Sequence, residues 1–260
     1  MQLPRQQYTK YTHEGKAIIW GPMPLAASGV THQGRRSTNE DAWLVDLDLG
    51  LLVVADGMGG HNAGEVASAL AVKVIREVFQ SDGNPRSQGV LTRAVQVANQ
   101  RILAAAAEQP AHAGMGTTVV AVIVVDERAY YTSVGDSRVY LWRNGRLTQL
   151  TRDDSWLAET LNGESEQPPD IGSHPMRHVL TKVVGLRYEL EPTVSECPLG
   201  EGDALLLCSD GVHGSVPHEL LATMMSSSRA VEDVAQNVVR SAIARGATDN
   251  VTAIVARLGN

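Results

Sequence analysis

The stretch LLVVADGMGG at residues 51–60 places an apolar run directly before an acidic residue and a cluster of glycines. An apolar run of this length predicts a buried strand, and the Asp56-Gly57 pair predicts where the strand ends. The same arrangement recurs at residues 130–136 and 204–210, where apolar runs lead into Asp136 and Asp210. A single Asp-Gly pair is usually only a turn. Several carboxylates carried to strand ends from distant parts of the chain predict a shared, oxygen-rich site for hard divalent cations.

The bulk composition is that of a globular protein with an acidic balance. The 260 residues can form one domain with a full core, and a hydrophobic content of 43% is ordinary. The net charge of -7 argues against a nucleic-acid partner or an anionic membrane surface. Two cysteines, Cys197 and Cys208, are too few for a disulfide framework and predict reduced thiols in the cytoplasm. Neither a signal peptide nor membrane insertion is predicted, because no apolar run approaches the ~20 residues of a membrane span.

Strand and helix patterns occur in separate groups along the chain. Apolar runs predict strands at residues 17–20, 43–47, 51–55, 117–125, 129–134, 139–142, 193–196, 203–208 and 251–257. Helical patterns occur at residues 63–79, 88–108, 151–161, 217–225 and 230–245. Because regular strand–helix alternation is missing, these groups favour an α+β fold of antiparallel sheets covered by helices over a doubly wound parallel sheet.

Local patterns add detail to this outline. Asn144-Gly145 predicts a tight hairpin turn. In the first predicted helix, one buried stripe is expected from the four-residue recurrence of Val66, Leu70, Val74 and Val78. Residues 162–178 are polar and rich in proline and glycine, which predicts a long and functional loop. We expect residues 1–25 to be an N-terminal extension with the first strand, and residues 26–260 to form a single domain.

The acidic residues suggest a specific chemistry if Asp56, Asp210 and Asp249 converge. Three carboxylates at one point repel one another, and two divalent cations would remove that repulsion. Two such ions ~4 Å apart can share a water, lower its pKa and direct it at phosphorus. Gly57 leaves room for its carbonyl to approach a cation. Further coordinated waters are expected at Glu40 and Asp41.

Arg36 lies shortly before Glu40 and Asp41 in the sequence, and two roles are open for it. The planar guanidinium group suits a phosphate dianion, because it can bind two oxygens at once. It could equally neutralise the neighbouring carboxylates.

Other hydrolase chemistries find little support in the sequence. Neither cysteine has the arginine spacing of a cysteine phosphatase, and GxSxG, HExxH, Walker and dinucleotide motifs are absent. A remote alternative is a serine esterase of the GDS type, built from Gly135-Asp136-Ser137 with Asp210 and His213. That alternative leaves Asp41, Asp56 and Asp249 without a role.

Six ordered blocks resemble the metal-dependent serine/threonine protein phosphatases of type 2C (PPM) in their bacterial form. The blocks are GRRSTNED (34–41), VVADGMGGHNAGEVAS (53–68), GMGTTVVA (114–121), VGDSRVYLWRNGRLTQLTRDDSW (134–156), LLLCSDGVHG (205–214) and ATDNVTAIV (247–255). The resemblance implies a four-layer α-β-β-α sandwich, in which helices flank two central antiparallel sheets. It also implies a flap beside the active site, at about residues 153–178.

The resemblance also implies roles for individual residues. Asp56 would bridge two Mn²⁺ or Mg²⁺ ions, and the Gly57 carbonyl would bind one of them. Asp210 and Asp249 would complete the shell of the other ion. Glu40 and Asp41 would act through water, and Arg36 would bind the phosphate. Asp136, together with Asp210, would hold a third, weaker ion.

The implied function is hydrolysis of phosphoserine and phosphothreonine in proteins, opposed to a cognate serine/threonine kinase. A non-enzymatic alternative is a related domain that has lost its metals and serves in sensing or docking. Met58 stands where animal members carry a histidine proposed as general acid, so we expect a water to protonate the leaving group. The roles of His213 and of His174 in the predicted loop stay open.

Overall fold

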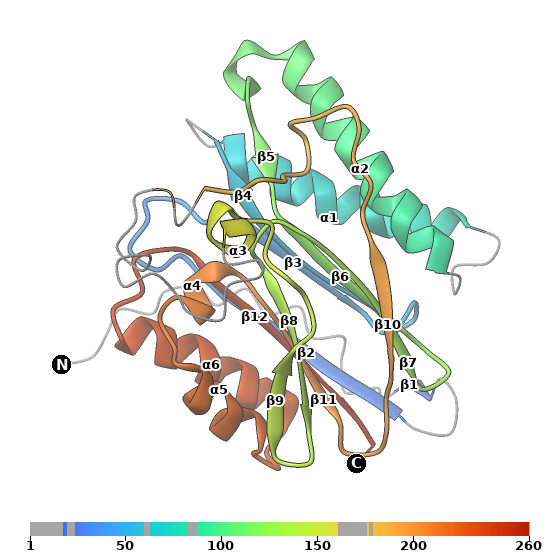
Figure 1. Cartoon of the computed structure of the whole chain (residues 1–260), viewed down its shortest axis with the longest axis vertical. Helices are drawn as coiled ribbons and strands as arrows, with labels where there is room; N and C mark the ends of the chain where they lie inside the picture. Colours follow the sequence, from blue (N-terminus) through green and yellow to red (C-terminus); the bar gives the residue numbers. More distant parts are fainter. Residues whose placement is uncertain are drawn as a thin grey trace.

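Two antiparallel sheets form the centre of the fold and helices cover both outer faces (Figure 1). This computed structural model describes residues 18–19, 24–59, 63–82, 88–160, 176 and 179–259. The first sheet has the order β1 (Ile18–Ile19), β2 (Pro24–His32), β12 (Val251–Leu258), β11 (Ala204–Cys208), β8 (Arg138–Arg143) and β9 (Arg146–Gln149). The second has the order β10 (Val194–Pro198), β7 (Arg128–Val134), β6 (Val119–Val125), β4 (Leu51–Met58) and β3 (Asp41–Asp46), with β5 (Gly116–Thr117) paired to β4.

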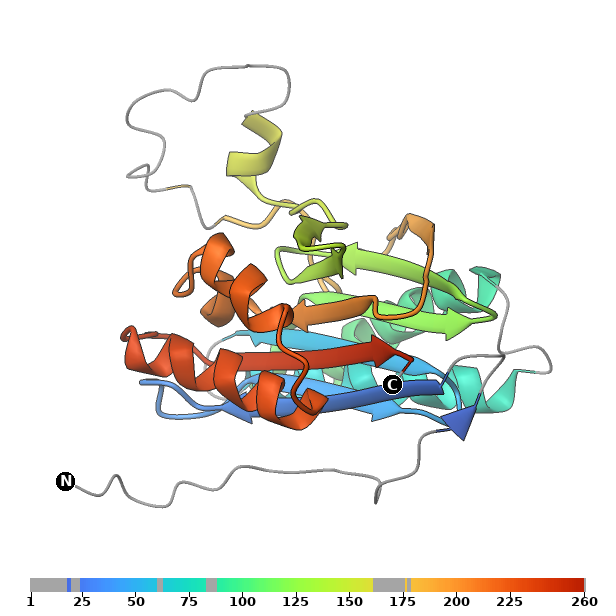
Figure 2. The ribbon, with the colours of Figure 1, turned by 90° about the horizontal axis from the view of Figure 1, so that it is seen from below.

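The helices divide between the two sheets. The second sheet packs against α1 (Ala63–Ser81) and α2 (Gln88–Glu108), and η1 (Pro110–His112) follows. The first packs against α5 (His218–Met225) and α6 (Val231–Ala244). Two short helices, α3 (Trp156–Thr160) and α4 (Asp210–His213), lie outside these layers. In Figure 2, α3 projects away from the two-sheet body. The predicted four-layer α-β-β-α sandwich is therefore confirmed.

The continuous apolar strands are explained by burial on both faces. In β4, Leu51, Val53 and Ala55 pack under the helices, whereas Leu52 and Val54 lie between the sheets. The same alternation occurs in β11, whose side chains face α5 and α6 or the space between the sheets. Strands of this kind have no polar face, so they read as unbroken apolar runs.

The buried stripe of α1 differs from the predicted one. The fully buried side chains are Ala67, Ala71, Ile75 and Phe79. Of the predicted stripe, only Val74 is buried, while Val66, Leu70 and Val78 are partly buried. Alanine has the smallest side chain that still favours a helix, so these positions let α1 lie close to β4 and α2.

Four elements have no counterpart among the predicted ranges: β2, β9, η1 and α4. Strand β2 was missed because its sequence, PLAASGVTH, is rich in small and polar residues. A small residue is required there, since a Cβ on Gly29 would lie 2.4 Å from the ring of Trp43. The predicted domain limit between residues 25 and 26 falls inside this strand. Helix α4 was missed because one helical turn gives no periodic pattern.

Most other predicted elements agree closely with the structure. Helix α2 has the predicted bounds, and the Asn144-Gly145 turn has φ values of 50° and 80°, as a tight hairpin requires. The strand predicted at 117–125 is interrupted at Thr118 and divides into β5 and β6. His174 and nearly all of the predicted loop at residues 162–178 lie outside the described residues. No described helix combines the length and the apolar content needed to cross a membrane.

Candidate metal centre

Acidic residues from both sheets gather at one end of the sandwich. Asp41 begins β3 and pairs in register with Asp56, near the end of the neighbouring strand β4. In the other sheet, Asp210 opens α4 directly after β11, and Asp249 precedes the adjacent strand β12. Asp136 follows β7. The topology thus brings together carboxylates that are far apart in sequence.

Every predicted site residue except Asp41 lines one pocket of about 530 Å³. The predicted residues on its wall are Arg36, Glu40, Asp56, Gly57, Asp136, Asp210 and Asp249. The same wall includes Met58, Gly59, Thr118, Val179, Leu180, Val183 and Leu186. The convergence on which the sequence argument depends is therefore present.

Two glycines allow the strands to meet this closely. A Cβ on Gly57 would lie 2.0 Å from the carbonyl oxygen of Gly64. A Cβ on Gly211, next to Asp210, would lie 1.9 Å from the carbonyl oxygen of Asn250. Any side chain at either position would push the acidic segments apart. These glycines are needed for backbone packing, independently of any cation.

Asp41 lies behind the pocket and is buried. Its Oδ2 accepts hydrogen bonds from the hydroxyls of Ser209 (2.8 Å) and Thr252 (2.6 Å). Its Oδ1 is buried and has no hydrogen-bond partner among the residues that the structure describes. Burial raises the pKa of Asp41 to about 7, and the two hydroxyls oppose that shift only in part. A buried carboxylate oxygen without a partner fits a position that ordered water or a cation shell completes.

Acids that line the pocket also have raised pKa values. Burial raises the pKa of Asp56 well above its usual value, and the charges of Asp41, Asp210, Asp136 and Asp249 raise it further. Burial followed by the charge of Asp210 raises the pKa of Asp136 to about 7. Burial also raises the pKa of Glu40. Within the described part of the chain, no lysine or arginine forms an ion pair with Asp41, Asp56 or Asp136.

The geometry limits how cations could be held here. Among the described residues, no three His, Cys, Asp or Glu side chains are grouped closely enough to enclose an ion. A site for Mg²⁺ does not require such a cage, because this ion keeps several waters and often takes only one or two carboxylates. The oxygen-only donor set suits Mg²⁺ or Mn²⁺. The residues therefore fit hydrated, hard cations.

Arg36 is paired with one of the pocket acids. Its Nη2 donates a hydrogen bond to Asp249 Oδ2 at 2.7 Å, and this bond raises the pKa of the guanidinium group. The Arg36 side chain remains 57% exposed at the pocket wall. The contact shows the neutralising role, while phosphate binding stays a prediction.

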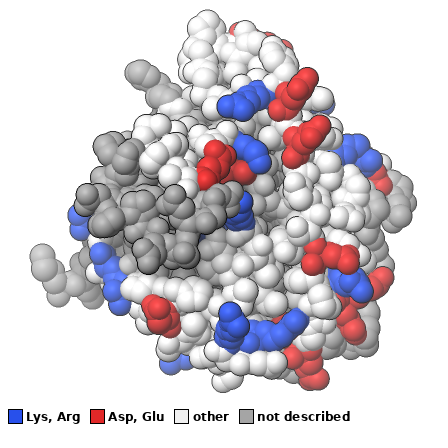
Figure 3. All heavy atoms as spheres, in the orientation of Figure 1, with Lys and Arg blue, Asp and Glu red and all other residues white. Residues whose placement is uncertain are grey.

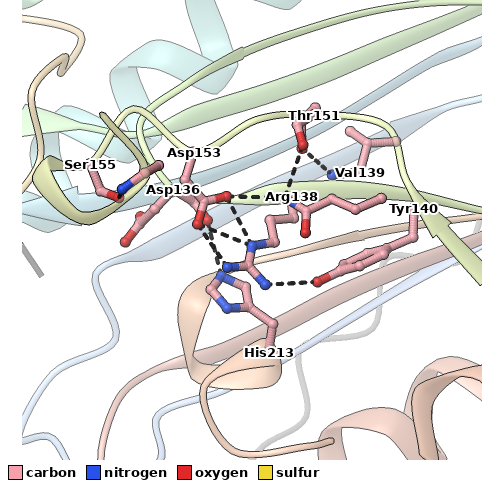
Figure 4. Close-up of polar contacts among 10 residues, drawn as sticks. Asp136, Arg138, Val139, Tyr140, Thr151, Asp153, Ser155 and His213 are labelled. Atoms are coloured by element: carbon pink, nitrogen blue, oxygen red, sulfur yellow. Dashed lines mark hydrogen bonds and ion pairs between the residues drawn. The ribbon is translucent and has the colours of Figure 1, made fainter. Parts of the chain in front are cut away.

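A second network anchors the loop that carries Asp136 (Figure 4). Arg138 donates to both carboxylate oxygens of Asp153, with the shortest distance 2.7 Å, and its Nη1 donates to the Tyr140 hydroxyl at 3.1 Å. His213 Nε2 donates to the Asp136 carbonyl at 3.0 Å. Burial lowers the pKa of His213 to about 4, so its ring is neutral near pH 7. The histidine acts as a structural anchor and does not line the pocket.

The same contacts argue against the GDS esterase alternative. Ser137 is buried, and its hydroxyl lies 2.7 Å from that of Thr118. His213 bonds to a backbone carbonyl instead of to the serine. No nucleophile activated by histidine is assembled from these residues.

Several supporting residues were not predicted. Thr118 accepts a hydrogen bond from the Asp56 amide, and Asn250 accepts one from the Glu40 amide. Ser209 and Thr252 hold Asp41. Each lies next to a predicted acid or within a quoted motif, but hydroxyl and amide groups carry no charge pattern that would single them out.

Comparison with known proteins agrees with the fold. Residues 28–255 match the family model described as Protein phosphatase 2C. The chain belongs to the protein phosphatase 2C family. The resemblance inferred from the six sequence blocks is thereby confirmed.

Bacterial members of the protein phosphatase 2C family are similar over most of the chain. Serine/threonine protein phosphatase PstP of Mycobacterium tuberculosis is 35% identical over 221 residues, covering 85% of this chain but 42% of PstP. The chain thus spans less than half the length of that relative. The serine/threonine phosphatase stp of Listeria welshimeri is 33% identical, over 79% of this chain and 83% of stp. The solved catalytic domain of PstP in complex with two manganese ions has a TM-score of 0.81 at 33% identity, covering 91% of this chain and 99% of that structure.

Proposed function

We propose that this protein is a metal-dependent serine/threonine protein phosphatase. The observation that carries the proposal is the single pocket lined by Asp56, Asp136, Asp210 and Asp249, with raised pKa values at Asp56 and Asp136. Its membership of the protein phosphatase 2C family supports the same activity. Carboxylates that repel one another in a recess are stabilised when divalent cations bind between them.

The cations would be held mainly by Asp56, Asp210 and Asp249, with the Gly57 carbonyl as a further ligand. When bound, a pair of Mn²⁺ or Mg²⁺ ions would supply positive charge and lower the pKa of a water, so that the water loses a proton and attacks phosphorus as hydroxide. PstP was solved with two manganese ions, which supports the choice of metal. Asp136 would contribute, with Asp210, to a third and weaker site.

The remaining roles belong to residues around these ligands. Glu40 orients water in the pocket and Asp41 orients water behind its wall, where Ser209 and Thr252 fix the Asp41 carboxylate. Arg36 binds the phosphate oxygens with the guanidinium nitrogens that Asp249 does not use. Met58 has no proton to donate, so solvent in the pocket protonates the leaving serine or threonine oxygen. No side chain becomes phosphorylated in this scheme.

The cellular setting belongs to the same proposal. We infer that the substrates are phosphorylated proteins and that a serine/threonine kinase opposes the enzyme. Residues 26–260 would act as one catalytic domain, with the flap near residues 153–178. A cytoplasmic location is supported by Cys197 and Cys208, both free thiols. The face in Figure 3 carries both acidic and basic side chains.

Release of inorganic phosphate from a phosphothreonine peptide tests this function. The metal-stripped protein should be inactive, Mn²⁺ or Mg²⁺ should restore turnover, and a chelator should remove it again. Wild-type protein that binds Mn²⁺ but releases no phosphate would favour the non-catalytic sensing module. Phosphate release that is unaffected by the chelator would contradict the mechanism.

A further inference from the structure

One side of the acidic pocket is formed by exposed apolar side chains. In the described residues, the large apolar side chains with the greatest exposure are Met58, Met176, Val179, Leu186 and Tyr188. Three of them, Met58, Val179 and Leu186, line the pocket together with Leu180 and Val183. We call these five pocket residues the apolar wall: Met58, Val179, Leu180, Val183 and Leu186.

Backbone hydrogen bonds hold the segment that carries most of the apolar wall. The Val179 carbonyl accepts a hydrogen bond from the Trp156 amide at 2.8 Å, and the Thr181 amide donates to the Asp154 carbonyl at 2.9 Å. Further along, Val184 and Thr117 exchange a pair of backbone bonds of 2.9 and 3.0 Å. The wall is therefore a bonded part of the fold.

Side-chain packing fixes the other end of the segment. Asn99 on α2 accepts a hydrogen bond from the Gly185 amide and donates one to the Arg187 carbonyl, both at 2.7 Å. Gly116 lies directly beneath the wall, since a Cβ there would meet Val183 at 2.6 Å and Leu186 at 3.2 Å. The backbone at Gly185 and Gly116 thus holds Leu186 in place while 44% of its surface stays exposed.

The exposed side chains of the apolar wall indicate a binding site. Val179 is 41% exposed and Met58 39% exposed, although both lie at a recess where burial is available. Isolated apolar residues on a surface need no explanation, but apolar side chains gathered around one pocket are typical of a binding site. Here the apolar wall is continuous with the pocket that contains Arg36 and Asp56.

The two sides of the pocket differ in the chemistry they offer. One side carries Arg36, Glu40 and Asp249, which suit a phosphate and its cations. The five side chains of the apolar wall carry no charged group. A residue next to a phosphorylated one lies ~3.3–3.6 Å further along an extended chain, so its side chain reaches past the phosphate pocket. An acidic side chain there would lose its hydration against apolar side chains without gaining a charged partner from the wall, whereas an apolar one would be favourably buried.

We propose that the apolar wall binds an apolar side chain of the substrate, one or two residues from the phosphorylated serine or threonine. This inference rests on the proposed phosphatase function and narrows its substrate class to phosphoprotein segments with a flanking leucine, methionine or similar residue. Val179 and Leu186 provide the contact, and Gly116 and Asn99 position Leu186.

A set of phosphothreonine peptides tests the inference with Mn²⁺-loaded enzyme. The reference peptide has alanine at all four flanking positions, and each variant peptide replaces one alanine with leucine or with aspartate. Apolar pockets discriminate by about 10-fold or more in kcat/KM, so the best leucine peptide should exceed the alanine peptide by about 10-fold. The aspartate peptide of the same position should fall below the alanine peptide.

Enzyme variants assign any such preference to the apolar wall. Leu186→Ser and Val179→Ser should each reduce the leucine-to-alanine ratio to about 2-fold, because a serine cannot bury the substrate side chain. Leu186→Met should retain most of the preference, since it conserves volume and polarity. Tyr188→Ser is the matched control, because Tyr188 is exposed but does not line the pocket. Its ratio should equal that of the wild type.

The ratio of two peptides on one enzyme preparation is insensitive to partial unfolding of a variant. Equal rates on the leucine and alanine peptides with wild-type enzyme would overturn the inference and leave the phosphatase function intact. A preference that survives in both serine variants would also overturn it. Failure to release phosphate from the alanine peptide in Mn²⁺ would count against the proposed function itself.

Discussion

Among the described residues, buried acids at one end of the sandwich form ion pairs with arginine, whereas buried acids at the other end do not. The same strands supply both groups of acids. Strand β3 begins at Asp41 and ends at Asp46, and strand β11 lies between Asp203 and Asp210. At one end, Arg76 pairs with Asp46 at 2.8 Å. Arg143 and the Gly200 amide likewise donate to Asp203, which is 5% exposed.

At the other end, the acids face one another. Asp41, Asp56 and Asp136 have no lysine or arginine ion-pair partner among the described residues, and their pKa values are raised. A paired buried acid is a structural element, because its charge is already compensated within the fold. An uncompensated group of buried acids lowers stability unless a ligand supplies the missing charge. The comparison therefore separates acids that hold the fold from acids that bind cations.

The largest effect is expected from exchanging one acid at each end. Asp56→Asn should lower kcat by about 10³-fold or more, because it removes the central cation ligand and with it the activated water. Without metal, the variant should be as stable as the wild type. The substitution removes a carboxylate whose pKa is raised and which is repelled by the neighbouring acids. The release of phosphate from a phosphothreonine peptide and a urea unfolding curve measure the two quantities.

Asp46→Asn is the matched control at the paired end. It should lower the free energy of unfolding by about 2 kcal/mol, because the buried partner of Arg76 loses its charge. Activity per folded molecule should stay near the wild-type level. If Asp46→Asn abolished turnover and Asp56→Asn kept it, the division between the two ends would be wrong.

Arg36 provides the next largest effect. Arg36→Ala should lower kcat/KM by about 10²-fold, mostly through a higher KM, because the phosphate loses a charged hydrogen-bond donor. Arg36→Lys should recover part of the loss, since lysine restores charge without the planar fork. Arg76→Ala controls for loss of a cation at the paired end and should leave KM unchanged. An unchanged KM in Arg36→Ala would restrict Arg36 to neutralising Asp249.

Arg138 is an arginine that forms an ion pair at the acidic end, so it tests whether pairing stabilises the fold there as well. Arg138→Met should lower the free energy of unfolding by about 2–3 kcal/mol, since Asp153 and the Tyr140 hydroxyl lose their donor. The loop that carries Asp136 should become less ordered as a consequence. Chemical denaturation measures the first effect, and hydrogen exchange at residues 135–138 the second. Unaltered exchange at that loop would contradict the positioning role.

The smallest effect is a pH dependence of stability. An acid whose folded pKa is raised stabilises the fold below its unfolded pKa, and this contribution is lost as pH rises through the folded pKa. For Asp41 and Asp136 the window runs from their usual 3.8 to about 7. The metal-stripped protein should therefore lose about 1–2 kcal/mol of unfolding free energy between about pH 5 and pH 8.

Two controls assign the dependence of the unfolding free energy on pH to these acids. The lowered pKa of His213 acts in the opposite direction below its usual 6.5, but it is one group against several acids. Asp41→Asn should flatten the slope, because the amide oxygen can still accept from Ser209 and Thr252 without titrating. Saturating Mn²⁺ should reverse the trend, since the cation competes with protons for the carboxylates. A metal-free protein that becomes more stable across this range would contradict the raised pKa values.

Much of this account could be predicted from sequence because the strands that deliver the acids are buried on both faces. Such strands, like β4 and β11, appear as unbroken apolar runs, and the acids directly after them mark one end of the sheet. The pairing of Asp41 with Asp56 across neighbouring strands could not be predicted, because register depends on contacts distant in sequence. Strand β2 escaped because packing against Trp43 demands small residues there.

The supporting groups were unpredictable for another physical reason. Ser209 and Thr252 matter only because both donate to one carboxylate oxygen of Asp41, Oδ2. Val179 and Leu186 matter only because a bonded segment presents them to the pocket. Single hydroxyl or apolar residues are common along any chain, so their meaning depends on the tertiary fold.

Calorimetric titration of the metal-stripped protein with Mn²⁺, near neutral pH, measures whether the acids of the pocket bind divalent cations. We expect about two ions bound per chain, loss of most of the binding heat in Asp56→Asn, and full retention in Asp46→Asn. Absence of Mn²⁺ binding by the wild type, or equal binding by Asp56→Asn, would contradict this expectation.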